Sequence, residues 1–96
     1  MKRSNDQSMK SALDEWLREA RLSEKLNERR LISKWEKLFG KTIAKYSRKI
    51  AVRNRTLYLT VESAPLRQEM LFNKQVMIDR INSAIAEGMI QEIVPR

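Results

Sequence analysis

The sequence predicts an α+β domain with the element order α-α-β-β-α-β. Three observations support this class: apolar residues recur at helical spacing in the first half, alternate with polar residues from Lys49, and return to helical spacing after Ser63. A hairpin followed by a helix and a returning strand closes into one three-stranded sheet through a crossover. We therefore expect helices packed on one face of the sheet and an open opposite face.

The length of 96 residues suits one domain with a modest core. We place this domain, a single α/β unit, at residues 8–94. Residues 1–7 are polar and lack periodicity, which predicts a disordered start to the chain.

Two helices are expected before the hairpin. The first begins near Ser8, and the second follows a break at residues 22–23, with Ser23 as its cap. Gly40 stands where a helix adopts a left-handed C-terminal residue, so residues 41–47 form either a continuation or a separate turn. Three aromatic residues on the apolar helical faces are predicted to enter the core: Trp16, Trp35 and Phe39.

Two alternating runs, residues 49–53 and 56–61, predict a β-hairpin. Only Asn54 and Arg55 separate them. Asn suits the first place of a tight hairpin turn, but Arg at the second costs roughly 1 kcal/mol relative to Gly. The alternative to a two-residue turn is therefore a longer loop.

The second half of the chain is predicted to contain one more helix and one more strand. Ser63 and Pro65 form a helix start, with Ser as the cap and Pro in the first turn. One helix is expected from there until Gly88 stops it. The apolar run Met89–Val94, closed by Pro95, predicts the last strand.

Positive charge is concentrated in the middle of the chain. Residues 25–55 carry eleven Lys and Arg against two Glu, a net +9, whereas the remaining residues sum to −1. Such a concentration attracts polyanions because each neutralised phosphate releases condensed counterions. Nucleic acid is therefore the predicted partner, with single-stranded DNA favoured and RNA as the alternative.

Six of these cations fall within an arc of roughly 80° on a helical wheel, and the apolar face is centred roughly 130° away. We call them the predicted ridge: Arg30, Lys34, Lys37, Lys41, Lys45 and Arg48. The hairpin extends this set of phosphate-binding candidates by Lys49, Arg53 and Arg55. A solvated helix face is the other interpretation. However, the ridge has few acids at i,i+4 spacing, and its like charges repel unless something outside compensates them.

Two further residues are candidates for binding. Tyr58 points to the open face of the sheet, where its ring could stack on an unpaired base; an ordinary surface Tyr is the alternative. Arg67 lies near the apolar side of the third helix. It either makes a structural contact with a carboxylate or a backbone group, or binds a partner.

Catalysis is not expected. The sequence has no His and no Cys, which removes the commonest general base and thiolate chemistry, and two Gly cannot form a glycine-rich phosphate loop. No apolar run approaches the ~20 residues of a membrane span. We predict a cytoplasmic, non-enzymatic protein without cofactor, metal, membrane or small-molecule substrate. A small basic ribonuclease that works with Lys, Arg and Tyr is the enzymatic alternative.

Several short segments occur in a characteristic order and spacing. They are Trp35 with Phe39-Gly40, the segment 43–47, the strand 56–61, the segment 63–70, and Arg80-Ile81-Asn82. Together, from about Ser8 to Val94, they resemble the DciA-like family, long catalogued as a bacterial domain of unknown function. The compact form of this chain, which ends just after the last predicted strand, is similar to family members from Bacteroidetes-type bacteria. The resemblance implies a KH-like fold, DNA binding, and a role in loading or operating the replicative helicase.

The predicted function is thus a nucleic-acid-binding accessory of DNA replication that makes sequence-independent phosphate contacts. Two alternatives are a protein-interaction module that docks its basic patch on an acidic partner such as the helicase, and a KH-like RNA-binding protein. Family members often have Gly in the hairpin turn where this chain has Arg55, and longer members add a tail that contacts the helicase.

Overall fold

The computed structural model describes the backbone of residues 2–96 and the side chains of residues 8–96. Met1 and the side chains of residues 2–7 lie outside this part, so the disordered start at residues 1–7 stays a prediction. The elements are α1 (Lys2–Tyr46), β1 (Ser47–Arg53), β2 (Thr56–Val61), α2 (Ala64–Phe72), α3 (Lys74–Ala84) and β3 (Glu92–Pro95). The α+β class is confirmed, and the order roughly matches α-α-β-β-α-β: Gly40 divides the first helix, and two helices, α2 and α3, stand where one was predicted.

Helix α1 is longer than predicted because nothing stops it at Ser23. The chain stays helical as far as Phe39 and leaves helical geometry at Gly40, where φ is 91° and ψ is 168°. The predicted break at residues 22–23 is wrong: the segment contains neither Gly nor Pro, and Ser is tolerated inside a helix at modest cost. Gly40 separates the long helix from a short helical segment at 41–46. Of the two alternatives, the separate turn therefore forms and the continuation does not.

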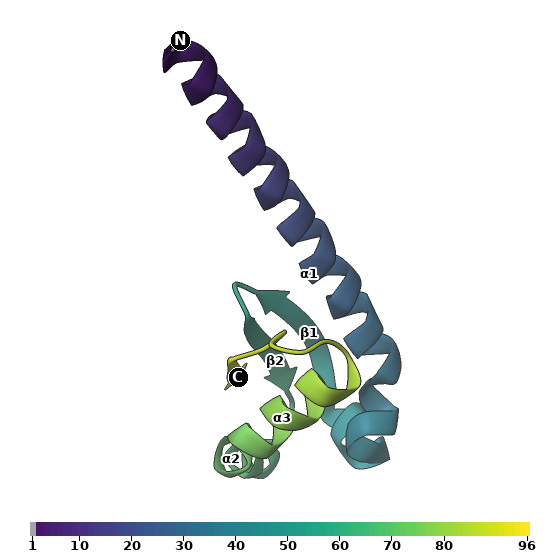
Figure 1. The fold of residues 1–96 in the computed structure, drawn as a ribbon. Coiled ribbons are helices and arrows are strands. Elements are labelled where there is room, and N and C mark those ends of the chain that lie inside the picture. The colour runs from purple at the N-terminus through teal and green to yellow at the C-terminus, as the bar shows by residue number, and fades with distance from the viewer. Residues whose placement is uncertain (1) are drawn as a thin grey trace.

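The long helix has a projecting part and a packed part (Figure 1). Every side chain from Ser8 to Ser23 is exposed, and we call these residues the arm. Farther along, Leu31 and Trp35 are buried in the core with 0% and 3% of their surface exposed. Trp16 is 63% exposed, so its predicted place in the core is wrong, whereas that of Trp35 is confirmed. Phe39 is half-buried and packs against the core at a ring distance of 4.6 Å from Trp35.

The sheet has the strand order β1-β2-β3, with β1 antiparallel and β3 parallel to the central β2. Two residues form the hairpin turn, and both are left-handed: φ is 50° at Asn54 and 59° at Arg55, as in a type I′ turn. Arg55 is held there by the loop between α3 and β3, since its Nε donates to the Gly88 carbonyl at 3.0 Å. Its own carbonyl accepts from the Gln91 N–H at 2.8 Å. The longer loop does not form.

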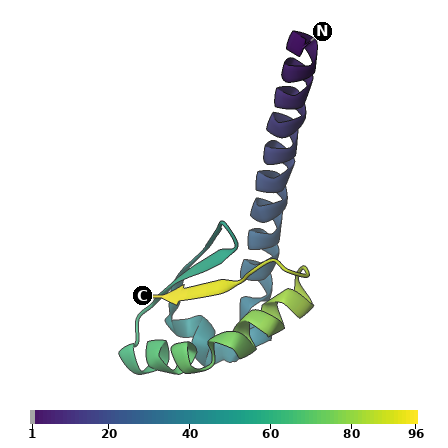
Figure 2. The same cartoon turned by 60° about the vertical axis from the view of Figure 1, so that its left-hand side comes forward.

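One face of the sheet is buried and the other is open, as predicted. Along β2, Leu57, Leu59 and Val61 are buried and alternate with half-buried residues. Helices α2 and α3 and the packed part of α1 cover the apolar face (Figure 2). The backbone N–H of Val52 donates to Glu28 Oε2 at 2.7 Å, which ties α1 to β1 just beyond the arm.

The second half departs from prediction at its boundaries. Ser63 caps α2 as expected, accepting a hydrogen bond from the Leu66 N–H at 3.3 Å. The single helix predicted as far as Gly88 is wrong, because Asn73, with φ −104° and ψ 22°, divides it into α2 and α3. Strand β3 begins at Glu92 rather than at residue 89. Ile90 is instead buried in the preceding loop, where its backbone N–H and carbonyl both bond the Asn82 amide at 2.8 Å.

Candidate nucleic-acid interface

A shallow hollow of about 330 Å³ lies on the open face of the sheet. We call it the open-face hollow; its lining residues are Lys49, Ala51, Arg53, Tyr58, Thr60 and Arg96. Strand alternation explains why they gather there. Successive side chains of a strand point to opposite faces, so the polar positions of β1 share a face because Ile50 and Val52 point to the core.

Tyr58 lies in the middle of this hollow because of the pairing register. It stands opposite Ala51, while Lys49 pairs with Thr60 and Arg53 pairs with Thr56. A cation therefore flanks the Tyr58 position on each side along β1. The small side chain of Ala51 leaves the surface beside the ring recessed, and Tyr58 itself is half-buried.

The third cation of the open-face hollow is Arg96. Its guanidinium carbon lies 5.1 Å from the centre of the Tyr58 ring, within cation–π range. Two backbone hydrogen bonds of 2.8 Å fix this residue beside β2: its N–H donates to the Leu59 carbonyl, and its carbonyl accepts from the Val61 N–H. Arg96 thus continues the pairing of β3 with β2.

Among the described side chains, the cations of the open-face hollow have no acidic partner. The ion pairs among the described side chains are Arg48 with Glu62 at 2.6 Å and Lys74 with Glu92 at 2.9 Å, so neither uses a residue of the hollow. Glu92 stands opposite Thr56 in register. A hydrogen bond from Lys74 and one from the Ile93 N–H hold the pKa of Glu92 below its usual range. The hollow therefore keeps its three positive charges available to an outside anion.

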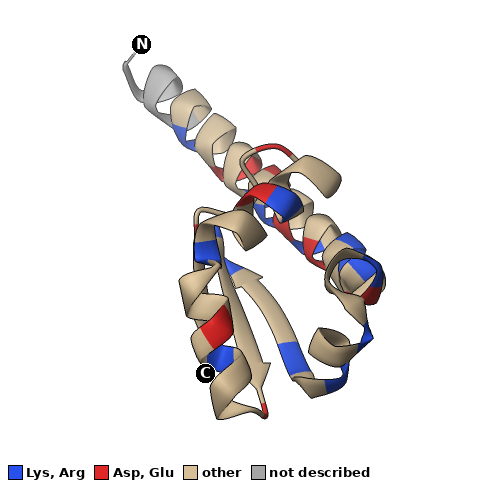
Figure 3. Cartoon of the chain, turned by 90° about the horizontal axis from the view of Figure 1, so that it is seen from below, with Lys and Arg blue, Asp and Glu red and all other residues tan. Residues whose placement is uncertain are grey.

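The predicted ridge is divided in the structure. Arg30, Lys34 and Lys37 lie exposed at helical spacing on α1 before Gly40 interrupts the helix. Lys41 and Lys45 follow on the short segment after the bend, so the predicted straight line of six charges does not form. Figure 3 shows basic positions on both α1 and β1, and β1 carries no acidic residue.

Three of the predicted binding residues have partners inside the fold. Arg48 pairs with Glu62, and Arg55 bonds the Gly88 carbonyl. Arg67 donates from its guanidinium to the Val61 carbonyl, which is the structural contact of its two alternatives. Because these groups already have partners, they are weaker candidates for an anion than Lys49, Arg53 and Arg96.

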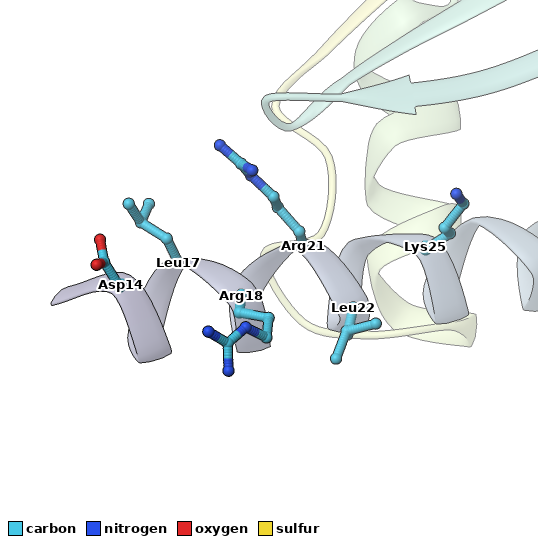
Figure 4. Close-up of a pocket in the computed structure, with 6 residues that line it drawn as sticks. All are labelled: Asp14, Leu17, Arg18, Arg21, Leu22 and Lys25. Carbon is cyan, nitrogen blue, oxygen red and sulfur yellow. The ribbon is translucent and has the colours of Figure 1, made fainter. Parts of the chain in front are cut away.

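A second hollow follows the surface of α1. Its six residues all come from that one helix: Asp14, Leu17, Arg18, Arg21, Leu22 and Lys25. Figure 4 shows that Arg18 and Leu22 leave the helix on the side opposite to Arg21, so the side chains do not enclose a site. Within the described side chains no acidic cluster of three or more could hold a metal ion. No helix in the described range is both long and apolar enough to cross a membrane.

Residues 8–94 match a family model described as Dna[CI] antecedent, DciA. The chain belongs to the DciA family. This confirms the resemblance found in the sequence, over the same residues. The DciA family is associated with loading of the replicative helicase in DNA replication. No curated protein matches the sequence.

In this member of the DciA family, sequence reasoning found two of the three cations in the open-face hollow and missed Arg96. The residue follows Pro95, which was predicted to close the last strand, and it stands far from the basic middle of the chain. The pairing of β3 beside β2 brings it to Tyr58, and no local pattern in the sequence signals that contact.

Proposed function

We propose that this protein binds single-stranded DNA without sequence preference and thereby assists the replicative helicase. Membership of the DciA family supports the link to the helicase. One observation supports DNA binding above the others: three cations, without acidic partners among the described side chains, surround the Tyr58 ring on the open face of the sheet.

The cations would hold phosphates. Lys49 and Arg53 stand four residues apart on one side of β1, about 13 Å along a strand, so they would contact different phosphates. An Arg guanidinium binds a phosphate through two parallel hydrogen bonds, whereas the Lys ammonium acts as a point charge. Contacts of this kind position a nucleic-acid backbone and carry no sequence information.

Tyr58 would supply the stacking surface. Every base has a π-face, so stacking on an aromatic ring tolerates any sequence. The Arg96 guanidinium now lies over this ring. A base that stacks there would displace the guanidinium, which could then bind the neighbouring phosphate.

The first test compares two double charge reversals by fluorescence anisotropy on a labelled oligothymidine. Lys49→Glu/Arg53→Glu changes the open-face hollow, and Lys34→Glu/Lys37→Glu makes the same change in net charge on α1. Three phosphate contacts predict that log K falls with log salt at a slope of roughly −2 for the unchanged protein. The first variant should lose at least tenfold in affinity and bring the slope to roughly −0.7. The second should keep most of the affinity and the slope.

Each other outcome corrects a defined part of the proposal. If the α1 variant alone loses binding, the DNA lies on α1 and the open-face assignment is wrong. A flat salt response of the unchanged protein would contradict nucleic-acid binding altogether. Tighter binding to an oligouridine of equal length would make RNA the ligand.

Stacking has its own test. Tyr58→Ala should weaken binding by about 1–3 kcal/mol, whereas Tyr58→Phe, which keeps the ring, should bind normally.

The helicase link is tested by co-purification with the cell's own replicative helicase from nuclease-treated lysate. Recovery that depends on intact nucleic acid would leave DNA binding in place and argue against a direct helicase contact.

A further inference from the structure

The arm carries an apolar stripe that no other part of the described chain covers. Met9, Leu13 and Trp16 are 66%, 56% and 63% exposed, and they follow one another at spacings of four and three residues. Leu17 and Ala20 widen the same stripe. On a 100° wheel this stripe continues the face that enters the core at Leu31.

A solitary arm of this kind is unfavourable in water. Most helical stability in proteins comes from packing an amphipathic face, and residues 8–23 pack theirs against no other part of the described chain. A contiguous exposed apolar surface rimmed by polar residues marks an interaction site. We propose that the stripe pairs with the same stripe of a second copy of the chain, with the two arms running antiparallel.

The side chains at the centre of this antiparallel pair are complementary in size. The spacing of four and three places Met9 and Trp16 at d positions and Leu13 and Ala20 at a positions of a heptad. In the register that places Trp16 of each copy opposite Ala20 of the other, the largest side chain of the stripe meets the smallest, while Leu13 and Met9 face Ser23 and Asn27. The contact repeats on both sides of the two-fold axis, so the interface is closed and limits the assembly to a dimer.

The flanking charges also favour this orientation. In the same register, Lys10 of each copy faces Glu24 of the other, which gives two pairs of opposite charge, and Leu17 meets its own counterpart. Glu19 also meets its own counterpart, the unfavourable contact of this arrangement. A parallel pair would instead place Glu19 beside Glu24 twice and leave Lys10 without an acid.

Long-range electrostatics points the same way. Residues 25–55 carry +9, whereas residues 8–24 have three basic and four acidic side chains, a net −1. Antiparallel arms place the two basic domains at opposite ends of the pair, separated by more than the Debye length of about 8 Å in physiological salt. Parallel arms would set these domains side by side. The antiparallel pair would bury on the order of 1,000 Å², near the lower limit for a specific interface.

Sedimentation equilibrium of the full chain tests the proposal with a matched pair of variants. Leu13→Glu places a charge in the stripe. Leu22→Glu places the same charge on the opposite side of the arm, at a residue of similar exposure, 62% against 56%. The unchanged protein and Leu22→Glu should form dimers with equal dissociation constants, and Leu13→Glu should raise the constant at least tenfold. Far-UV and near-UV circular dichroism of the diluted proteins checks that the packed domain is intact in both.

A charge exchange tests the orientation. Lys10→Glu alone and Glu24→Lys alone should each raise the dissociation constant about three- to tenfold, because each creates two like-charge pairs. The double variant should return to within about twofold of the unchanged protein. Positions 10 and 24 lie 14 residues apart in one helix and cannot compensate each other within a single arm. Additive losses in the double variant would overturn the antiparallel register.

The remaining outcomes are also decisive. A chain that stays monomeric up to about 1 mM would overturn self-pairing, even if Leu13→Glu then lost binding to the helicase, because the stripe would in that case serve another protein. Equal effects of Leu13→Glu and Leu22→Glu would overturn the assignment of the stripe. Neither result bears on DNA binding, which uses the open face of the sheet.

Discussion

The two parts of α1 have the same kind of apolar face and opposite surroundings. In the packed part, Leu31 and Trp35 are buried against the sheet, whereas in the arm Leu13 and Trp16 are more than half exposed. Both parts belong to one continuous helix, as Figure 1 shows. Apolar spacing therefore determines which side of a helix can be buried, while the path of the rest of the chain determines whether anything covers that side.

The largest expected effect separates the two Trp residues. Trp35→Ala should lower the free energy of unfolding by about 3–5 kcal/mol, because it removes a buried ring. The same change breaks the hydrogen bond from Trp35 Nε1 to Ser47 Oγ at 3.0 Å. Trp16→Ala should change the free energy of unfolding by about 0.5 kcal/mol or less in protein diluted until monomeric. Urea denaturation of both variants measures the difference. A large loss for Trp16→Ala would mean that the arm folds back onto the domain.

A smaller effect is expected where the long helix ends. Gly40→Ala should cost about 1–3 kcal/mol, because φ 91° with ψ 168° is a backbone conformation that L side chains rarely adopt. A Cβ at this position would meet no atom within 4 Å, so the cost is conformational and not steric. Unchanged stability with increased helicity in circular dichroism would show that α1 runs through residue 40. The predicted ridge would then become continuous.

The smallest effect is expected at the boundary between the two parts. Glu28→Ala removes the acceptor of the Val52 N–H and should cost about 1–2 kcal/mol. Glu19→Ala, the matched change within the arm, should leave the monomer within about 0.5 kcal/mol of its original stability. Hydrogen exchange of the Val52 amide supplies a local measurement, since its protection should fall in the first variant alone. Equal protection in both would show that α1 is not held to β1 by this bond.

Most local features of the fold could be predicted because they depend on neighbouring residues. The alternation of residues 49–61 determines the hairpin and places Tyr58 on the open face. Ser63 and Pro65 mark the start of α2, and Gly40 marks the end of the long helix. The predicted break at residues 22–23 is wrong because a potential capping residue does not by itself end a helix. A helix ends where Gly, Pro or a competing contact interrupts it.

The candidate site was only partly predictable. Lys49, Arg53 and Tyr58 were found because the hairpin fixes their relation, whereas Arg96 reaches the ring only through the parallel pairing of β3. The ridge divides because the chain bends at Gly40, where the sequence left a continuation and a separate turn open. Arg55 bonds the Gly88 carbonyl, which is distant in the sequence, so no local pattern reveals this contact; Arg67 bonds the nearby Val61 carbonyl, the structural alternative that its sequence position left open.

The helical and strand periods, the hairpin and its core-facing side, and the concentration of positive charge between residues 25 and 55 can all be predicted from the amino-acid sequence alone. These properties depend on residues a few positions apart, whose relative geometry is set by backbone sterics and local hydrogen bonds. The packing of the folded chain instead determines which apolar faces are covered and which cations have no acidic partner among the described side chains. The burial of an apolar face and the pairing of a charge both depend on contacts between segments distant in the chain. Contact with such a segment buries or pairs a side chain that would otherwise face water.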